Sequence, residues 1–82
     1  MKRYYRHASE SRLGEGTTWL EFDGEYATRQ VERYGDQWFS SRRDYDPRIG
    51  GTLYDQTRSL LKLTPDEEIS AEEFERVWEE AA

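Results

Sequence analysis

Residues 17–40 read TTWLEFDGEYATRQVERYGDQWFS, and this stretch decides the fold class. Residues 17–22 and 25–34 are rich in β-branched and aromatic side chains, which favour strands. The Asp23-Gly24 pair between them is typical of a two-residue hairpin turn. A second glycine-containing turn, at residues 35–36, leads to a short segment at 37–40. The sequence therefore predicts an antiparallel meander with strands at about 17–22, 25–34 and 37–40, to which a strand at about 3–8 adds a fourth.

The C-terminal segment has the signals of an amphipathic helix over about residues 71–81. Ser70 and Glu73 have the spacing of a capping box, and Ile69 lies where a hydrophobic staple would contact Phe74. Apolar residues then recur at spacings of three and four, at Phe74, Val77, Trp78 and Ala81. Because such an apolar stripe must be buried, we expect an α+β fold in which this helix packs on one face of the meander.

Residues 41–63 have a loop-rich composition without a clean hydrophobic period. Two interpretations remain open for its second half: a short helix around 52–60, or an extended piece at 60–63. Residues 65–68 are expected to form one helical turn. The whole chain, residues 1–82, is long enough for one domain and too short for two.

Two-residue turns would set the strand register and hence the two faces of the sheet. They would place Leu20 opposite Ala27 and Arg33 opposite Trp38. One face would then carry Thr18, Leu20, Phe22, Ala27, Val31 and Trp38, and we expect the helix to pack there. The other would carry Trp19, Glu21, Tyr26, Thr28, Gln30, Glu32, Tyr34 and Phe39. A one-residue change in either turn would exchange some of these assignments.

The net charge of −6 is concentrated near the C-terminal end. Residues 1–13 carry four bases and one acid, residues 14–63 carry seven bases and nine acids, and residues 64–82 carry one base and eight acids. Such a surface repels phosphate backbones and attracts basic proteins, so we expect a basic protein partner and no nucleic acid. The simpler interpretation is that these acids only keep a helix face solvated.

Composition also bears on metals, membranes and location. The chain has no cysteine and one histidine, His7, so neither a disulfide nor a thiolate metal site is available. The segment from Asp44 resembles a calcium loop but has Arg48 and Ile49 at its fifth and sixth positions, where a calcium loop has a ligand and a glycine. No apolar run could span a membrane. We expect a cytoplasmic protein of bacterial type, with no cofactor, no metal and no membrane partner.

The second face provides the candidate site, a partner-binding surface without catalytic residues. Its members are rings and acids: Trp19, Glu21, Tyr26, Glu32, Tyr34 and Phe39. Aromatic anchors supply contact energy, and the surrounding negative charge steers a cationic protein.

Two other functions remain open. Rings beside Glu21 and Glu32 could desolvate these carboxylates, which would suit a small carboxylate-dependent hydrolase, for which His7 is a further candidate base. Alternatively, the exposed rings could bury one another across a two-fold axis in a structural homodimer. We expect a monomer or a weak homodimer. RNA binding by stacking is disfavoured because Arg29 and Arg33 would lie on the face opposite the rings.

Two stretches resemble a known group of proteins: WLEFDGEYATRQVERYGD at residues 19–36 and EISAEEFERVW at residues 68–78. Together they resemble a family of small bacterial proteins whose members are similar to predicted immunity factors of toxin systems. The resemblance covers about residues 17–80 and implies a binding role, without adding catalytic residues.

Overall fold

The computed structural model describes all residues, 1–82, and has the expected α+β class. Its elements in chain order are β1 (Lys2–Ser11), β2 (Gly14–Asp23), β3 (Tyr26–Tyr34), β4 (Gln37–Ser40), β5 (Tyr45–Asp46), β6 (Gly50–Gly51), α1 (Arg58–Leu61), the 3₁₀ helix η1 (Pro65–Glu67), β7 (Glu68–Ile69) and α2 (Ala71–Glu80). The antiparallel meander and the C-terminal helix packed against it are confirmed.

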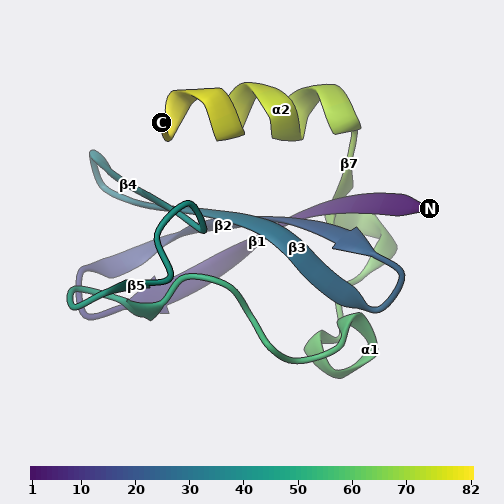
Figure 1. Cartoon of the computed structure of the whole chain (residues 1–82), viewed down its shortest axis with the longest axis horizontal. Helices are drawn as coiled ribbons and strands as arrows, with labels where there is room; N and C mark the ends of the chain where they lie inside the picture. Colours follow the sequence, from purple (N-terminus) through teal and green to yellow (C-terminus); the bar gives the residue numbers. More distant parts are fainter.

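The main sheet has five strands in the order β4-β3-β2-β1-β7, and every described pairing is antiparallel. Figure 1 shows α2 on one face of this sheet and the segment containing β5, β6 and α1 on the other. Through β7 the chain passes from the side of the loop-rich segment to the side of α2. Ile69 of β7 pairs there with Tyr4 of β1. The sheet is therefore the middle of three layers.

A β-bulge in β3 corrects the expected register. Phe22 pairs with Ala27, but the next residue along β2, Glu21, pairs with Arg29, so Thr28 is the extra residue. The first hairpin turn is made by Gly24 and Glu25 instead of the expected Asp23 and Gly24, which shifts the pairing by two residues. The bulge adds one more, so Leu20 lies opposite Gln30 rather than Ala27. A one-residue insertion moves every later side chain to the other face. The expected faces were therefore right for Tyr26 and Ala27 but wrong, relative to β2, from Arg29 to the end of β4. The expected pairing of Arg33 with Trp38 is confirmed.

The helix α2 begins at the predicted Ser70 cap, although the Glu73 carboxylate pairs with Arg6 instead of completing the capping box. The Ser70 hydroxyl accepts a hydrogen bond from the backbone N–H of Glu73 at 3.1 Å. Phe74 is fully buried, with its ring centroid 5.3 Å from that of Tyr4. Tyr4 is directly opposite Glu21, so α2 covers the face that carries Glu21 and Trp19. The expectation that α2 would cover the face of Leu20 and Phe22 was therefore wrong.

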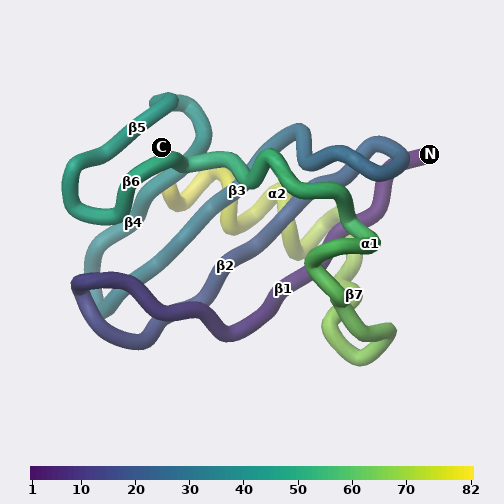
Figure 2. Tube along the Cα trace, turned by 90° about the horizontal axis from the view of Figure 1, so that it is seen from below, coloured from purple at the N-terminus to yellow at the C-terminus, as the bar shows by residue number.

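The opposite face has its own core, made by Tyr5, Leu20 and Phe22. Residues from the loop-rich segment pack against it: Tyr54, Leu61 and Leu63, together with Ala27 of β3. Figure 2 shows this segment running along the side of the sheet away from α2. Its helix is a single turn at Arg58–Leu61, so the extended alternative for 60–63 was wrong. Leu61 is helical because its amide bonds the Thr57 carbonyl at 3.2 Å.

Candidate functional site

The six residues expected to form one partner-binding surface lie on both faces of the sheet. Trp19, Glu21 and Tyr26 lie on the α2 side, whereas Glu32, Tyr34 and Phe39 lie on the side of the loop-rich segment, because the bulge reverses the later part of β3. The expected common face was therefore wrong.

Burial separates the six residues further. Glu21, Tyr34, Phe39 and Glu32 are 1%, 3%, 5% and 8% exposed, and Trp19 is partly buried. Tyr26, at 63% exposure, is the one member of the six with a largely accessible side chain. A contact of Tyr26 with a partner remains a prediction.

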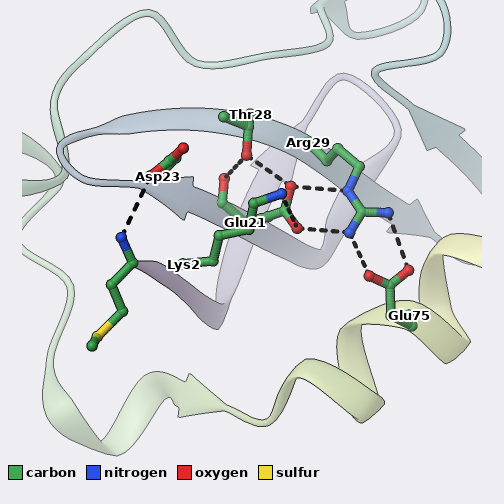
Figure 3. Close-up of polar contacts among 7 residues, drawn as sticks. Lys2, Glu21, Asp23, Thr28, Arg29 and Glu75 are labelled. Atoms are coloured by element: carbon green, nitrogen blue, oxygen red, sulfur yellow. Dashed lines mark hydrogen bonds and ion pairs between the residues drawn. The ribbon is translucent and has the colours of Figure 1, made fainter.

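On the α2 side, Arg29 joins the sheet to the helix through two carboxylates (Figure 3). Its Nη2 donates to Glu21 Oε2 at 2.6 Å and its Nε donates to Glu21 Oε1 at 2.9 Å. Its Nη1 donates to Glu75 Oε1 of α2 at 3.1 Å. The hydroxyl of Thr28, the bulge residue, donates to Glu21 Oε1 at 2.8 Å, so the bulge supplies a partner for this buried carboxylate.

The same contacts determine the charge of the network. Hydrogen bonds from Arg29 lower the pKa of Glu21 from 4.5 to about 2, against the opposing effect of burial. Hydrogen bonds from Arg29 also lower the pKa of Glu75, while the two carboxylates raise the pKa of Arg29. The guanidinium carbon lies 5.0 Å from the ring centroids of both Phe74 and Trp78. Glu21 is thus ionised near neutral pH, covered by protein and suited to connecting two layers.

On the opposite face, a partly buried chain of hydroxyl groups leads to Glu32. The Thr18 hydroxyl donates to Ser9 Oγ at 2.9 Å, Ser9 Oγ lies 3.3 Å from the Tyr34 hydroxyl, and Tyr34 donates to Glu32 Oε1 at 2.7 Å. The Gln30 amide donates to Glu32 Oε2 at 2.9 Å, and its carbonyl accepts from the Tyr54 backbone N–H at 2.9 Å. This chain joins the sheet to the loop-rich segment.

These positions count against a catalytic pair made by Glu21 and Glu32. The two carboxylates lie on opposite faces of the sheet and cannot act on one substrate, which corrects the expected common concavity. His7 Nδ1 lies 2.9 Å from the Ala8 carbonyl oxygen, and no acid is hydrogen-bonded to its ring.

Two observations concern metals and membranes. No group of three or more His, Asp or Glu side chains is placed to share a metal ion. None of the helices combines the length and the apolar character that crossing a bilayer requires.

The glutamates near the C-terminal end of the chain fall into two groups, those that form ion pairs and those that do not. Glu68 pairs with Arg3 at 3.0 Å, Glu73 with Arg6 at 2.9 Å, and Glu75 with Arg29. Three further glutamates are exposed, form no ion pair and, by helical spacing, share the side of α2 opposite Phe74: Glu72, Glu79 and Glu80. We call these three the α2 acidic face. The sequence placed this charge near the C-terminal end, but it did not indicate which of the acids are unpaired.

Two members of this face oppose helix stability. Glu79 and Glu80 lie in the last turn of α2, which contains no basic residue. The C-terminal end of a helix carries partial negative charge, so acids there are unfavourable. Arg76 lies between them and Glu72 without forming an ion pair, which leaves this side of α2 with a net charge of −2.

No protein-family model, curated protein or solved structure matches the chain. The fold and the charged surface define the class of molecule: an α+β protein with a five-stranded antiparallel sheet, one amphipathic helix and a net charge of −6. The resemblance to immunity-like proteins stays a prediction.

Proposed function

We propose that the protein is a non-enzymatic protein-binding domain that binds a basic protein partner through the α2 acidic face. The observation that carries this proposal is that Glu72, Glu79 and Glu80 are exposed and unpaired, although neighbouring acids pair with arginines of the sheet. Glu79 and Glu80 also occupy helix positions that stability disfavours, so a role outside the folded chain accounts for them better.

The physical consequence is an association that depends on salt. Negative charge on one side of the molecule raises the rate at which a cationic protein arrives. Dissolved salt weakens this attraction, because at 0.1 M it screens charges that are more than about 10 Å apart. Tyr26 provides an exposed ring for contact energy. The resemblance to immunity factors supports a basic toxin as the partner, in a bacterial cytoplasm.

The test compares the wild type with a variant of the α2 acidic face. Glu72→Gln, Glu79→Gln and Glu80→Gln together remove three charges and leave the inward side of α2 unchanged. Glu10→Gln, Glu15→Gln and Asp36→Asn form the matched control, because these acids are also exposed and unpaired but lie in or beside the sheet. Each protein is used at low salt to capture partners from a lysate of the source organism, and the captured protein is then purified and its affinity measured.

We expect the wild type and the control to bind a basic protein in stoichiometric amount and to release it at high salt, whereas the α2 variant does not bind it. Equal affinity for the α2 variant and the wild type would contradict the proposed surface. Failure of the wild type to bind any basic protein would contradict the proposed function.

The two alternatives lack a supporting contact. The hydrolase required either Glu21 and Glu32 in one concavity or His7 as a base. Glu21 and Glu32 lie on opposite faces, and no acid is hydrogen-bonded to the His7 ring. The homodimer required exposed rings, yet Tyr34 and Phe39 are buried within the chain. Sedimentation tests the homodimer separately, because a dimer gives a mass that rises with concentration.

A further inference from the structure

A cavity of about 240 Å³ lies between the C-terminal end of α2 and the segment from β4 to β6. In Figure 1 the C-terminus lies closer to β4 than to β5, which is on the other side of the sheet. The cavity is lined by two aromatic residues, three arginines and one acid, with smaller residues between them: Trp38, Phe39, Arg42, Arg43, Asp46 and Arg48. Because Trp38 and Phe39 are consecutive residues of an edge strand, the cavity follows the open edge of the sheet.

The charge of this cavity is opposite to that of the chain. Three arginine side chains and one acidic side chain line it, in a protein with a net charge of −6. Asp46 is engaged by Arg48, whose Nε and backbone N–H donate to Oδ1, both at 2.9 Å, and whose Nη2 donates to Oδ2 at 2.8 Å. Hydrogen bonds from Arg48 hold the pKa of Asp46 far below its usual range, so Asp46 is ionised and neutralises Arg48. Arg42 forms no ion pair, and Arg43 shares Asp46 with Arg48 at a longer distance of 3.4 Å.

Arg42 is held in place by neighbouring groups. Its guanidinium carbon lies 3.8 Å from the ring centroid of Trp78, and its Nη2 donates to the Trp78 carbonyl oxygen at 2.8 Å. Its Nη1 donates to Ser40 Oγ at 3.3 Å. A guanidinium has five N–H donors, so Arg42 keeps donors for a ligand while its orientation is fixed.

Arg43 is available for a ligand for a different reason. Its one side-chain hydrogen bond is a long contact of 3.4 Å from Nη1 to Asp46 Oδ2, an oxygen already bound by Arg48. Its side chain is 69% exposed. A ligand can therefore recruit Arg43 without breaking a strong contact.

We propose that this cavity binds a small oxyanion, namely the phosphate or carboxylate group of a small molecule, through Arg42 and Arg43. Guanidinium groups match such anions because two parallel N–H donors meet two oxygens. The volume is below the roughly 300–1,000 Å³ of pockets for drug-sized ligands, which favours a compact ligand. Trp38 provides an apolar wall for the carbon part of the ligand. None of the three glutamates of the α2 acidic face lines the cavity, and the site requires no protein partner.

The experiment is a titration of the isotope-labelled full chain, followed by amide and indole NMR signals. The probes are inorganic phosphate, phenyl phosphate and benzoate, each added against sodium chloride at equal ionic strength. We expect saturable shifts confined to residues 38–52, to the Trp38 indole and to the last turn of α2. A tighter affinity for phenyl phosphate than for benzoate assigns a phosphate ligand, and the reverse order assigns a carboxylate.

Variants test the named arginines. Arg43→Gln should weaken binding about tenfold or more, as expected for a lost hydrogen bond between charged groups. Arg42→Lys keeps the charge but loses the fork, and should weaken binding similarly. Arg12→Gln is the matched control because Arg12 is exposed, unpaired and outside the cavity, and it should bind as the wild type does.

Arg43→Gln is suited to this test because the exposed side chain makes one long contact, so its amide spectrum should remain that of the folded wild type. Shifts that do not saturate, or that spread over the whole surface, would overturn the proposal. Equal affinities for Arg43→Gln and the wild type, or an equal loss in Arg12→Gln, would overturn it as well.

Discussion

Arg29 shows how a single residue can connect two layers of this small protein. Its guanidinium bonds Glu21 of the sheet and Glu75 of α2, and it lies 5.0 Å from the ring centroids of Phe74 and Trp78. The side chain of Glu21 is only 2% exposed. Removing one partner of such a buried pair leaves a charge without compensation, so each member matters more than an exposed ion pair would.

Replacing Glu21 tests this network directly. Glu21→Gln should lower the free energy of unfolding by about 2–4 kcal/mol, because Arg29 would keep only the more exposed Glu75 as a partner. Urea denaturation measures the change. Glu72→Gln removes the same charge from an exposed, unpaired site in the first turn of α2, where only the helix dipole favours an acid, and should lower the free energy of unfolding by less than about 1 kcal/mol. Equal effects of the two variants would contradict the structural role of Glu21.

Gly16 is a second residue on which the packing depends. A Cβ atom at this position would lie 2.1 Å from the Arg33 carbonyl oxygen and 2.4 Å from Tyr34 Cδ1. The close approach of β2 and β3 here therefore requires a residue without a side chain.

The prediction is that Gly16→Ala destabilises the protein by about 1–3 kcal/mol, because the backbone of β3 or the Tyr34 ring must move. Thermal unfolding followed by circular dichroism measures it. Gly51→Ala is the control, since a Cβ at Gly51 meets no atom within 4 Å. A Gly16→Ala protein as stable as the Gly51→Ala protein would argue against this close approach.

At the scale of elements, α2 depends on its first turn more than on its last. The Ser70 hydroxyl binds the Glu73 N–H, whereas Glu79 and Glu80 face the negative end of the helix dipole. The first turn thus contributes stability and the last turn reduces it.

We therefore expect Ser70→Ala to lower the free energy of unfolding by about 1 kcal/mol, whereas Ser70→Asp, which also caps well, should retain it. Urea unfolding of both variants, followed by the helical circular dichroism signal, makes the comparison. If Ser70→Asp lost as much stability as Ser70→Ala, the cap would not be the source of the effect.

The bulge in β3 acts at the same scale. If Thr28 were paired regularly with Glu21, Glu32 and Tyr34 would lie on the α2 side of the sheet, and Arg29 would not reach Glu75. Because of the bulge, Glu21 of β2 contacts the α2 side, whereas Glu32 of β3 contacts the side of the loop-rich segment.

At the scale of the whole molecule, ion pairs within the sheet and between the sheet and α2 link stability to pH. Contacts with Arg29 lower the pKa of Glu21 to about 2 and lower that of Glu75, and contacts with Arg3 lower that of Glu68. A carboxyl group whose pKa is lower in the folded state stabilises that state above its unfolded pKa. This stability is lost as the pH falls through the folded pKa.

We expect the stability of the wild type to be nearly constant between about pH 5 and neutral pH and to fall as the pH decreases from 4.5 towards 2, the interval set by Glu21. Thermal unfolding measured across this range tests the expectation. Glu21→Gln, which cannot titrate at this position, should show a shallower decrease. A wild type whose stability rises on acidification would contradict the assigned ion pairs.

The sequence by itself determined the features that depend on neighbours along the chain. The Ser70 cap, the apolar spacing of α2, the turn at Gly35-Asp36 and the strand at 37–40 follow from local conformational preferences, and the structure has each of them. The concentration of acids near the C-terminal end is likewise a property of composition.

Only the tertiary structure decided which residues meet. No local signal distinguished a bulge at Thr28 from regular pairing, and this one residue determines which face carries Glu32, Tyr34 and Phe39. The cavity beside Arg42 and the core contacts of Tyr54 join segments far apart in the chain. Such contacts form where buried surfaces and charges satisfy one another in three dimensions, whereas helix caps and turns are stabilised by residues a few positions away.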